Sequence, residues 1–139
     1  MEKKSEKKDK AVCLVAVKNQ KILLIKKENV WILPGGHPEN SAETDLDCLK
    51  RHLDEQLPCV KIDELRLFGG FFGESAFKDV QSKSHYQLEA AAYQGEVSGE
   101  IVSNGTNESR WFDNSGLDQA NLSEITRKVV KALRKSNRL

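Results

Sequence analysis

The chain has 139 residues, a length that fits one domain with a single hydrophobic core. Its hydrophobic content of 38% is that of a globular protein, and its 22 basic residues nearly balance 21 acidic ones, which argues against nucleic acid as a partner. No apolar run is long enough for a membrane span or a signal peptide, and the three cysteines form no paired framework, so we expect reduced thiols and a cytoplasmic location.

Residues 1–10 have almost no apolar content and are predicted to form a disordered tail, which leaves residues 11–139 as one domain. Two β-rich runs, residues 11–17 and 21–25, flank Asn19, which tolerates a left-handed backbone. They predict a hairpin. A short strand over residues 31–33 should then stop at a Pro-Gly-Gly turn.

The first helix is predicted over residues 41–57. Asn40 with Glu43 three residues later has the pattern of a capping box, and Ser41 is the competing cap. Leucines then recur at spacings of three and four and predict one apolar stripe, and Pro58 should end the helix. The stripe consists of Leu46, Leu49, Leu53 and Leu57.

The second half of the chain reads mostly as strands. Strands are predicted over residues 60–72, 85–94 and 108–112, and the first should contain a bulge at Gly69 and Gly70. A loop is predicted over residues 73–84 and a turn over residues 96–100. A last helix over residues 122–135, capped by Asn121, should bury Leu122, Ile125, Val129 and Leu133. The predicted fold is α+β, with a mixed sheet between two helices.

One face of the first helix is polar and lies beside the leucine stripe. A rotation of about 100° per residue places Asp45, Cys48, His52, Glu55 and Gln56 on this face. The Gly35-Gly36 turn directly precedes the helix, and its bare backbone is suited to approach a phosphate or to offer a carbonyl to a metal. We therefore expect His52, Glu55 and Gln56 to open onto this turn in a concave pocket.

This arrangement resembles the Nudix, or MutT-like, hydrolase family over nearly the whole chain. The family's box is Gly, five residues, Glu, seven residues, then Arg-Glu-apolar-x-Glu-Glu-x-Gly-apolar. Gly36 matches the glycine and Glu43 the first glutamate, with six residues between them, and seven further residues lead to Arg51. The resemblance implies an α/β/α sandwich, a Glu43–Arg51 pair that braces the loop against the helix, and divalent cations that neutralise a diphosphate and activate water.

The departures fall where the family does its chemistry. His52 and Gln56 replace two of the three glutamates that end the box, Pro58 replaces its second glycine, and Glu55 remains. The predicted metal ligands are therefore Glu55, His52 and Gln56, and they should hold Mg²⁺ or Mn²⁺ weakly if at all, because two negative charges are missing. For His52 a solvent-facing position is the alternative, and Gln56 is most simply a neutralised remnant.

Further site residues are predicted outside the helix. Gly35, Gly36 and Trp31 are candidates for contact with a substrate, although Trp31 also suits the core. Glu89 lies in mid-strand among alanines, where a buried charge would need a partner. It is a candidate metal ligand or general base, and an ion pair with a neighbouring strand is the equal alternative. The predicted catalytic set is thus Glu55, Glu89, Arg51 and Glu43.

Two functions follow from the resemblance. The favoured one is a hydrolase that cuts a nucleoside diphosphate linked to another group, with altered or reduced metal dependence, because Gly36, Glu43, Arg51 and Glu55 stand in their places. The alternative is a non-catalytic module of the same fold that binds a nucleotide or a protein partner. A homodimer is compatible with both functions, and the near-zero net charge disfavours nucleic acid.

Overall fold

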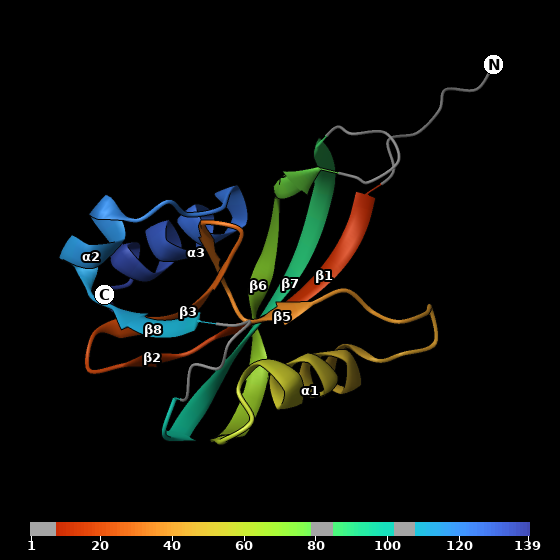
Figure 1. The fold of residues 1–139 in the computed structure, drawn as a ribbon, viewed down its shortest axis with the longest axis horizontal. Helices are drawn as coiled ribbons and strands as arrows, with labels where there is room; N and C mark the ends of the chain where they lie inside the picture. Colours follow the sequence, from red (N-terminus) through yellow and green to blue (C-terminus); the bar gives the residue numbers. More distant parts are fainter. Residues whose placement is uncertain (1–7, 79–84, 102–107) are drawn as a thin grey trace.

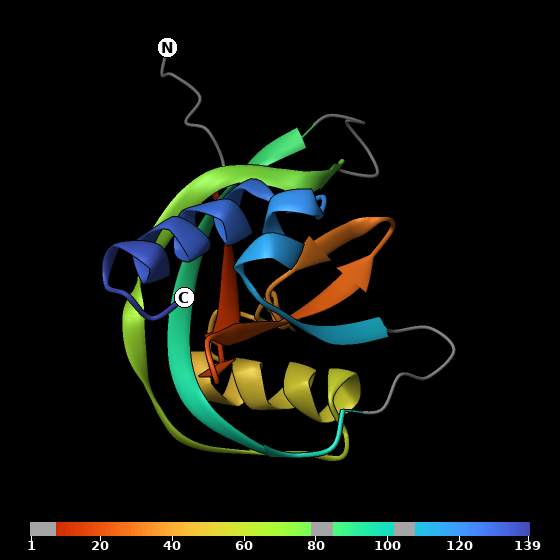
Figure 2. The same cartoon turned by 90° about the vertical axis from the view of Figure 1, so that its left-hand side faces the viewer.

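The computed structural model describes residues 8–78, 85–101 and 108–139. Helices lie on opposite sides of two β-sheets, with helix α1 (Asp45–Gln56) on one side and helices α2 (Asn114–Gln119) and α3 (Glu124–Lys135) on the other (Figures 1 and 2). This arrangement confirms the predicted α+β class. Within the described residues, no helix is long and apolar enough to cross a membrane.

The first sheet has the strand order β5-β1-β7-β6. Its members are β5 (Gly35–Gly36), β1 (Lys8–Val15), β7 (His85–Gly99) and β6 (Val60–Lys78). Strand β1 pairs in parallel with β7, whereas β1–β5 and β6–β7 are antiparallel, so the sheet is mixed as predicted. Residues 8–10, which were predicted to belong to a tail, are part of β1, and residues 1–7 lie outside the described residues.

The second sheet contains β2 (Val17–Lys18), β3 (Lys21–Lys27) and β4 (Val30–Ile32), and β8 (Glu108–Phe112) pairs with β3. Asn19 and Gln20 have φ values of 53° and 61° and connect β2 to β3 as a tight hairpin, as predicted for Asn19. The run over residues 11–17 is not one strand of this hairpin, however. It is divided at Ala16 between the two sheets.

Strand β1 supplies side chains to both halves of the hydrophobic core, because successive residues of a strand point to opposite faces. Val12 and Leu14 pack with the apolar side of α1, whereas Cys13 and Val15 pack with the apolar side of α3. Strand β3 alternates in the same way, with Leu23 in the α1 half. The two strands thus form the middle layer of an α/β/α sandwich.

Helix α1 begins later than the sequence predicts. Thr44, and neither Asn40 nor Ser41, is the N-cap, and its side chain accepts a hydrogen bond from the Asp47 N–H at 3.1 Å. Asn40 instead closes a turn with the Ala42 N–H. The late start removes residues 41–44 from the helix. The predicted stripe is consequently shorter, since Leu46 is 43% exposed while Leu49, Leu53 and Leu57 are buried.

Four further boundaries differ from the predictions. Residues 73–78, predicted as loop, continue β6, and residues 79–84 lie outside the described part of the chain. Residues 95–99 continue β7 in place of a turn. Helix α2 was not predicted, and α3 starts at Glu124 with Ser123 as its cap, not Asn121. The four predicted core residues of the last helix segment are all buried, and a register shift precedes Gly69 as expected for a bulge.

Candidate functional site

Gly35 and Gly36, predicted as a turn, form the short strand β5 because they pair with Val12 and Cys13 of β1. The last turn of α1 is attached to this Gly-Gly segment by the Gln56 side chain. Its Oε1 accepts a hydrogen bond from the Gly35 N–H at 2.9 Å, and its Nε2 donates to the Gly35 carbonyl at 2.9 Å. Gly35 has a φ of 134°, and a Cβ there would lie 2.1 Å from the Val12 carbonyl oxygen, so this position requires glycine. Gln56 therefore uses both ends of its carboxamide to hold the N–H and the carbonyl of one residue, Gly35.

His52 contacts the same turn one helical turn earlier. Its Nε2 donates to the His37 carbonyl at 2.8 Å, and its ring lies so close to Gly36 that a Cβ there would be 2.4 Å from the ring. Cys48 is fully buried, and its Sγ lies 3.7 Å from the Gly36 carbonyl oxygen. Gln56, His52 and Cys48 thus form one face of α1 that is in contact with the turn, as the helical geometry predicts.

Glu43 and Arg51 form the brace that the family resemblance implies. The Arg51 guanidinium donates to both Glu43 oxygens, at 2.9 and 3.0 Å, and to the His37 carbonyl at 3.2 Å. The Glu39 N–H adds a hydrogen bond of 2.7 Å to Glu43. Arg51, followed by the Glu39 N–H, lowers the pKa of the Glu43 carboxyl from 4.5 to about 2. The Glu43 carboxylate in turn raises the pKa of Arg51. The Glu43 and Arg51 charges therefore hold the loop between Gly36 and α1 against the helix.

The carboxylates of this region are not gathered into one metal site. Glu55 is exposed, and within the described residues no hydrogen bond or ion pair is found for its side chain. Asp45, predicted on the same helix face, is paired with Lys10 at 2.5 Å and accepts a hydrogen bond from the Tyr93 hydroxyl at 2.9 Å. No group of three or more His, Cys, Asp or Glu residues suited to a metal ion occurs in the described ranges.

The other predicted residues lie apart from this face. Trp31 is 7% exposed and packs in the α3 half of the core, with its ring centroid 4.8 Å from that of Phe112. Glu89 is exposed, not buried as the argument from its alanine neighbours assumed, and its partner in the sheet register is Lys10. Lys10 is paired with Asp45, and among the described residues no ion pair is found for Glu89.

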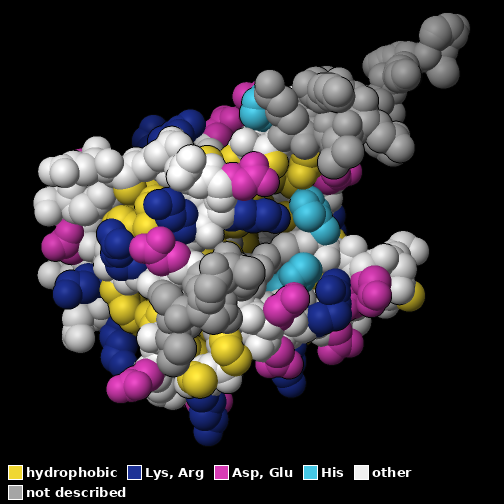
Figure 3. Space-filling view, in the orientation of Figure 1, with side chains coloured by type: hydrophobic (Ala, Val, Ile, Leu, Met, Phe, Trp, Pro, Cys, Tyr) yellow, Lys and Arg dark blue, Asp and Glu magenta, His cyan; other side chains and the backbone are white. Residues whose placement is uncertain are grey.

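A cleft of about 280 Å³ lies beside the Gly-Gly turn, between the first sheet, the β3–β4 turn and the start of α3. Gly35, Gly36 and His37 form one end of it, and among its described lining residues none belongs to α1. The space-filling view shows a hollow near the middle of this face, bordered by apolar, basic and histidine side chains (Figure 3). The turn thus has the cleft on one side and the polar face of α1 on the other. The prediction that His52, Glu55 and Gln56 open into a concave pocket at the turn is therefore wrong for this cleft, because Gly35 and Gly36 lie between it and the helix.

The cleft combines an apolar floor with polar groups of both charges, among them the side chains of Lys27, Glu28 and Glu74. Leu88 and Ala90 supply apolar surface, and buried Cys13, whose pKa is raised to about 12 by desolvation, remains a neutral thiol. The Lys27 ammonium lies 5.2 Å from the Phe77 ring centroid. An apolar floor, an aromatic ring and charges of both signs suit a ligand that has a flat apolar part and polar groups.

His37 is the residue of this site that the sequence analysis missed. Its Nδ1 donates to the Lys10 carbonyl at 2.7 Å, and its ring centroid is 6.4 Å from that of Tyr86, which also lines the cleft. His37 directly follows the Gly-Gly pair in the sequence, and this position was the available signal.

Comparison with known proteins agrees with this geometry. The model of the NUDIX domain matches residues 7–133. No curated protein matches the chain significantly. Among solved structures, a MutT NUDIX hydrolase from Burkholderia pseudomallei has a TM-score of 0.69 and 24% identity, over 91% of this chain and 98% of the other.

Two further structures share the fold. The NUDIX domain of Shewanella oneidensis NrtR, complexed with ADP ribose, has a TM-score of 0.66 and 16% identity, over 95% of this chain and 90% of the other. A UDP-X diphosphatase has a TM-score of 0.60 and 19% identity, over 98% and 67% of the two chains. The brace between Glu43 and Arg51, the sandwich fold and the match over residues 7–133 establish that the chain belongs to the Nudix family.

Proposed function

We propose that this protein binds a nucleoside diphosphate linked to another group in the cleft beside Gly35 and Gly36, and that binding, not rapid metal-dependent hydrolysis, is its main activity. This reverses the order of the two functions favoured from the sequence. The observation that carries the proposal is the pair of hydrogen bonds between the Gln56 carboxamide and Gly35.

The Gln56 contact supports a site without the family's usual metal set. The Nε2 group points its N–H at the Gly35 carbonyl, so it presents a donor where a metal ligand would have to present a lone pair. His52 likewise donates a hydrogen bond from its Nε2–H to the His37 carbonyl. With Glu55 as the one carboxylate left at these positions, the donors do not fit a cluster of hard divalent cations.

The cleft retains what ligand binding needs. The Phe77 and Tyr86 rings give flat surfaces for a base or sugar. Lys27 gives a positive charge, and His37 lies beside Gly36, where the backbone is accessible. The lining also includes the carboxylates of Glu28 and Glu74. Two structures of the same fold, an ADP ribose complex and a UDP-X diphosphatase, support the choice of a nucleoside diphosphate derivative as the ligand class.

The proposal is tested by calorimetric titration of ADP-ribose and a UDP-sugar into native protein, with and without Mg²⁺. We expect binding that is nearly independent of Mg²⁺ and is weakened at least about tenfold by Lys27→Glu, which reverses a charge in the cleft. The matched control is Lys50→Glu, on the exposed side of α1. Binding that appears only with Mg²⁺ would contradict the proposal.

Slow hydrolysis is the second candidate, because the Glu55 carboxylate is exposed and the Glu43–Arg51 brace is intact. In this case Glu55, with His52 and Gln56 as weak neighbours, would hold a Mg²⁺ or Mn²⁺ ion, and Glu89 would be the candidate base. The double variant His52→Glu/Gln56→Glu should raise Mg²⁺ affinity about a hundredfold, if each restored charge contributes about tenfold. Glu55→Ala should abolish any turnover of the native protein. Equal, tight Mg²⁺ binding by native protein and double variant would show that other residues hold the ion.

A further inference from the structure

The positive charge of the molecule is concentrated at its C-terminal end. Residues 114–139 contain six Lys and Arg residues against two Asp and Glu residues, a formal charge of +4, whereas the whole chain has a formal charge of +1. The preceding residues therefore have a formal charge of −3. A local excess of this size attracts anionic partners to one side of a nearly neutral protein.

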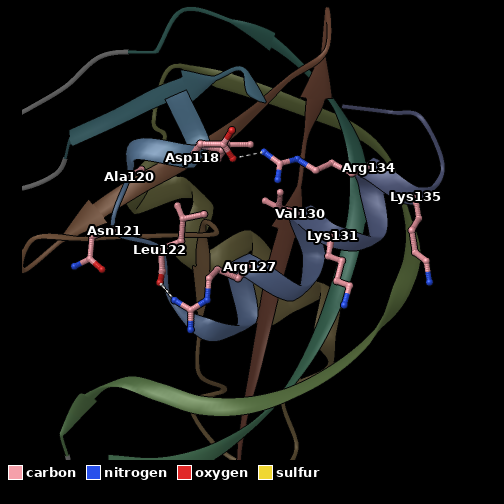
Figure 4. A pocket seen from close by; sticks show the side chains of 10 residues that line it. Asp118, Ala120, Asn121, Leu122, Arg127, Val130, Lys131, Arg134 and Lys135 are labelled. Carbon is pink, nitrogen blue, oxygen red and sulfur yellow. Dashed lines mark hydrogen bonds and ion pairs between the residues drawn. The ribbon is translucent and has the colours of Figure 1, made fainter. Parts of the chain in front are cut away.

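These charges surround a groove between α3 and the segment that leads from α2 to it. The groove has a volume of about 650 Å³, and buried Leu117, Leu122 and Val130 contribute apolar surface to it. Figure 4 shows Leu122 and Val130 between the guanidinium groups of Arg127 and Arg134. The groove shares no described lining residue with the cleft beside the Gly-Gly turn, so its occupant is independent of the proposed function.

The two arginines are held in place by the protein itself. Arg127 Nη1 donates to the Leu122 carbonyl at 2.6 Å, and Arg134 Nε donates to the Asn114 side-chain oxygen at 2.7 Å. A guanidinium has five N–H donors, so each arginine keeps donors for a ligand. Because both heads are already oriented, a ligand would lose little side-chain entropy in binding them.

Two lysines of α3 complete the positive rim. Lys131 and Lys135 line the groove and are exposed, and neither forms an ion pair with the described part of the chain. They lie four residues apart on one side of the helix, about 6 Å along its axis. Their charges are thus available to a partner, and changing them breaks no ion pair within the described part of the chain.

The groove already binds a carboxylate. Asp118 Oδ1 accepts a hydrogen bond from Arg134 Nη2 at 3.0 Å, and the Asp118 side chain is 67% exposed. The described lining contains aliphatic side chains and no aromatic ring on which a base could stack, and Asp118 would repel a phosphate backbone. We infer that this groove is a docking site for an acidic segment of a partner protein, in which an apolar side chain between carboxylates packs against Leu122 and Val130.

The test uses a short fluorescein-labelled peptide in which leucines alternate with pairs of glutamates, titrated with the full-length protein and followed by fluorescence anisotropy. We expect saturable binding that Lys131→Glu/Lys135→Glu weakens by about tenfold or more, since two attractive charges become repulsive. The matched control, Lys50→Glu/Lys61→Glu, makes the same change in net charge at exposed positions away from the groove and should leave the affinity unchanged. Circular dichroism of all variants verifies the fold.

A variant of opposite sign sharpens the test. Asp118→Asn frees Arg134 and should tighten peptide binding by a few-fold, whereas Asp54→Asn on α1 should not. Replacing the leucines of the peptide with serine should weaken binding, because the apolar surface of the groove is then left without a partner. Absence of peptide binding, equal weakening by both lysine pairs, or tighter binding of a single-stranded or duplex oligonucleotide than of the peptide would overturn the inference.

Discussion

Helices α1 and α3 cover opposite faces of the sheets with similar apolar sides, but their polar sides differ. The polar side of α1 is occupied: Gln56, His52 and Arg51 all donate to backbone carbonyls of the Gly35–His37 segment. The polar side of α3 keeps cations that form no ion pair in the described chain, Lys131 among them. On α1, side chains at positions of the Nudix box thus make structural contacts. On α3, by contrast, lysine side chains are left that are able to bind a partner.

The buried sides of the two helices should be equally costly to damage. Leu49→Ala in α1 and Leu133→Ala in α3 should each lower the free energy of unfolding by about 3 kcal/mol, because both side chains are fully buried. Leu46→Ala, at a position 43% exposed, should cost less than about 1 kcal/mol. Urea denaturation measures all three. A large loss of unfolding free energy for Leu46→Ala would mean that Leu46 is buried and belongs to the apolar stripe, as predicted from the sequence.

The occupied polar side of α1 predicts a coupling that α3 does not have. In Gly36→Ala the new Cβ would lie 2.4 Å from the His52 ring, which must move and lose its hydrogen bond to His37. The expected loss of stability is about 1–2 kcal/mol. In a His52→Ala background the same change should cost almost nothing, and the double-mutant cycle measures the difference. Additive losses would mean that His52 is not packed against Gly36 in solution.

The N-caps of the two helices offer a direct comparison. Thr44→Ala and Ser123→Ala each remove a side chain that accepts a backbone hydrogen bond, from Asp47 and Thr126 respectively, and each should cost about 1 kcal/mol. Ser41→Ala, at the cap predicted as an alternative from the sequence, should cost less than about 0.5 kcal/mol. Thermal unfolding of the three variants checks where α1 begins.

The smallest effect is a dependence of stability on pH. The pKa of Glu43 falls from 4.5 to about 2 on folding, so its contribution to stability is present above pH 4.5 and is lost as pH falls toward 2. The pKa of Glu124 on α3 is also lowered, chiefly by the Glu74 N–H and then by Lys128. Glu43→Gln should flatten the acid limb of the stability curve. If the acid limb of the Glu43→Gln stability curve were unchanged, other carboxylates would be responsible for the acid sensitivity.

The elements with strong local signals were predicted well. The last strand lies at residues 108–112 as predicted, and the four apolar residues of the final helical segment are buried, because alternation and helical spacing there agree with the fold. The prediction of one strand over residues 11–17 was wrong at Ala16. The chain passes there from one sheet to the other, and no Gly or Pro marks the change. Helix α2 was missed because it is one short element with Gly116 in its first turn.

The candidate site was predicted in its parts and not in its chemistry. Helical geometry placed Gln56 and His52 against the Gly-Gly turn, and the box spacing identified the Glu43–Arg51 brace. The sequence could not show that Gln56 bonds to both polar groups of Gly35, since this depends on the distance between helix and turn. Glu89 was argued to be buried from its neighbours in the chain, but its exposure is set by the neighbouring strands.

The parallel pairing of β1 with β7 has a consequence for folding. Lys8 pairs with Gln87 and Val15 with Gln94, so the partner of the first described strand is almost eighty residues away in the chain. During synthesis, the apolar residues of β1 cannot pair with β7 until β7 has left the ribosome. Because β1 contributes to both halves of the core, the completion of both halves is delayed. Such long-range pairing slows folding and lengthens the time for which strand edges are open to aggregation.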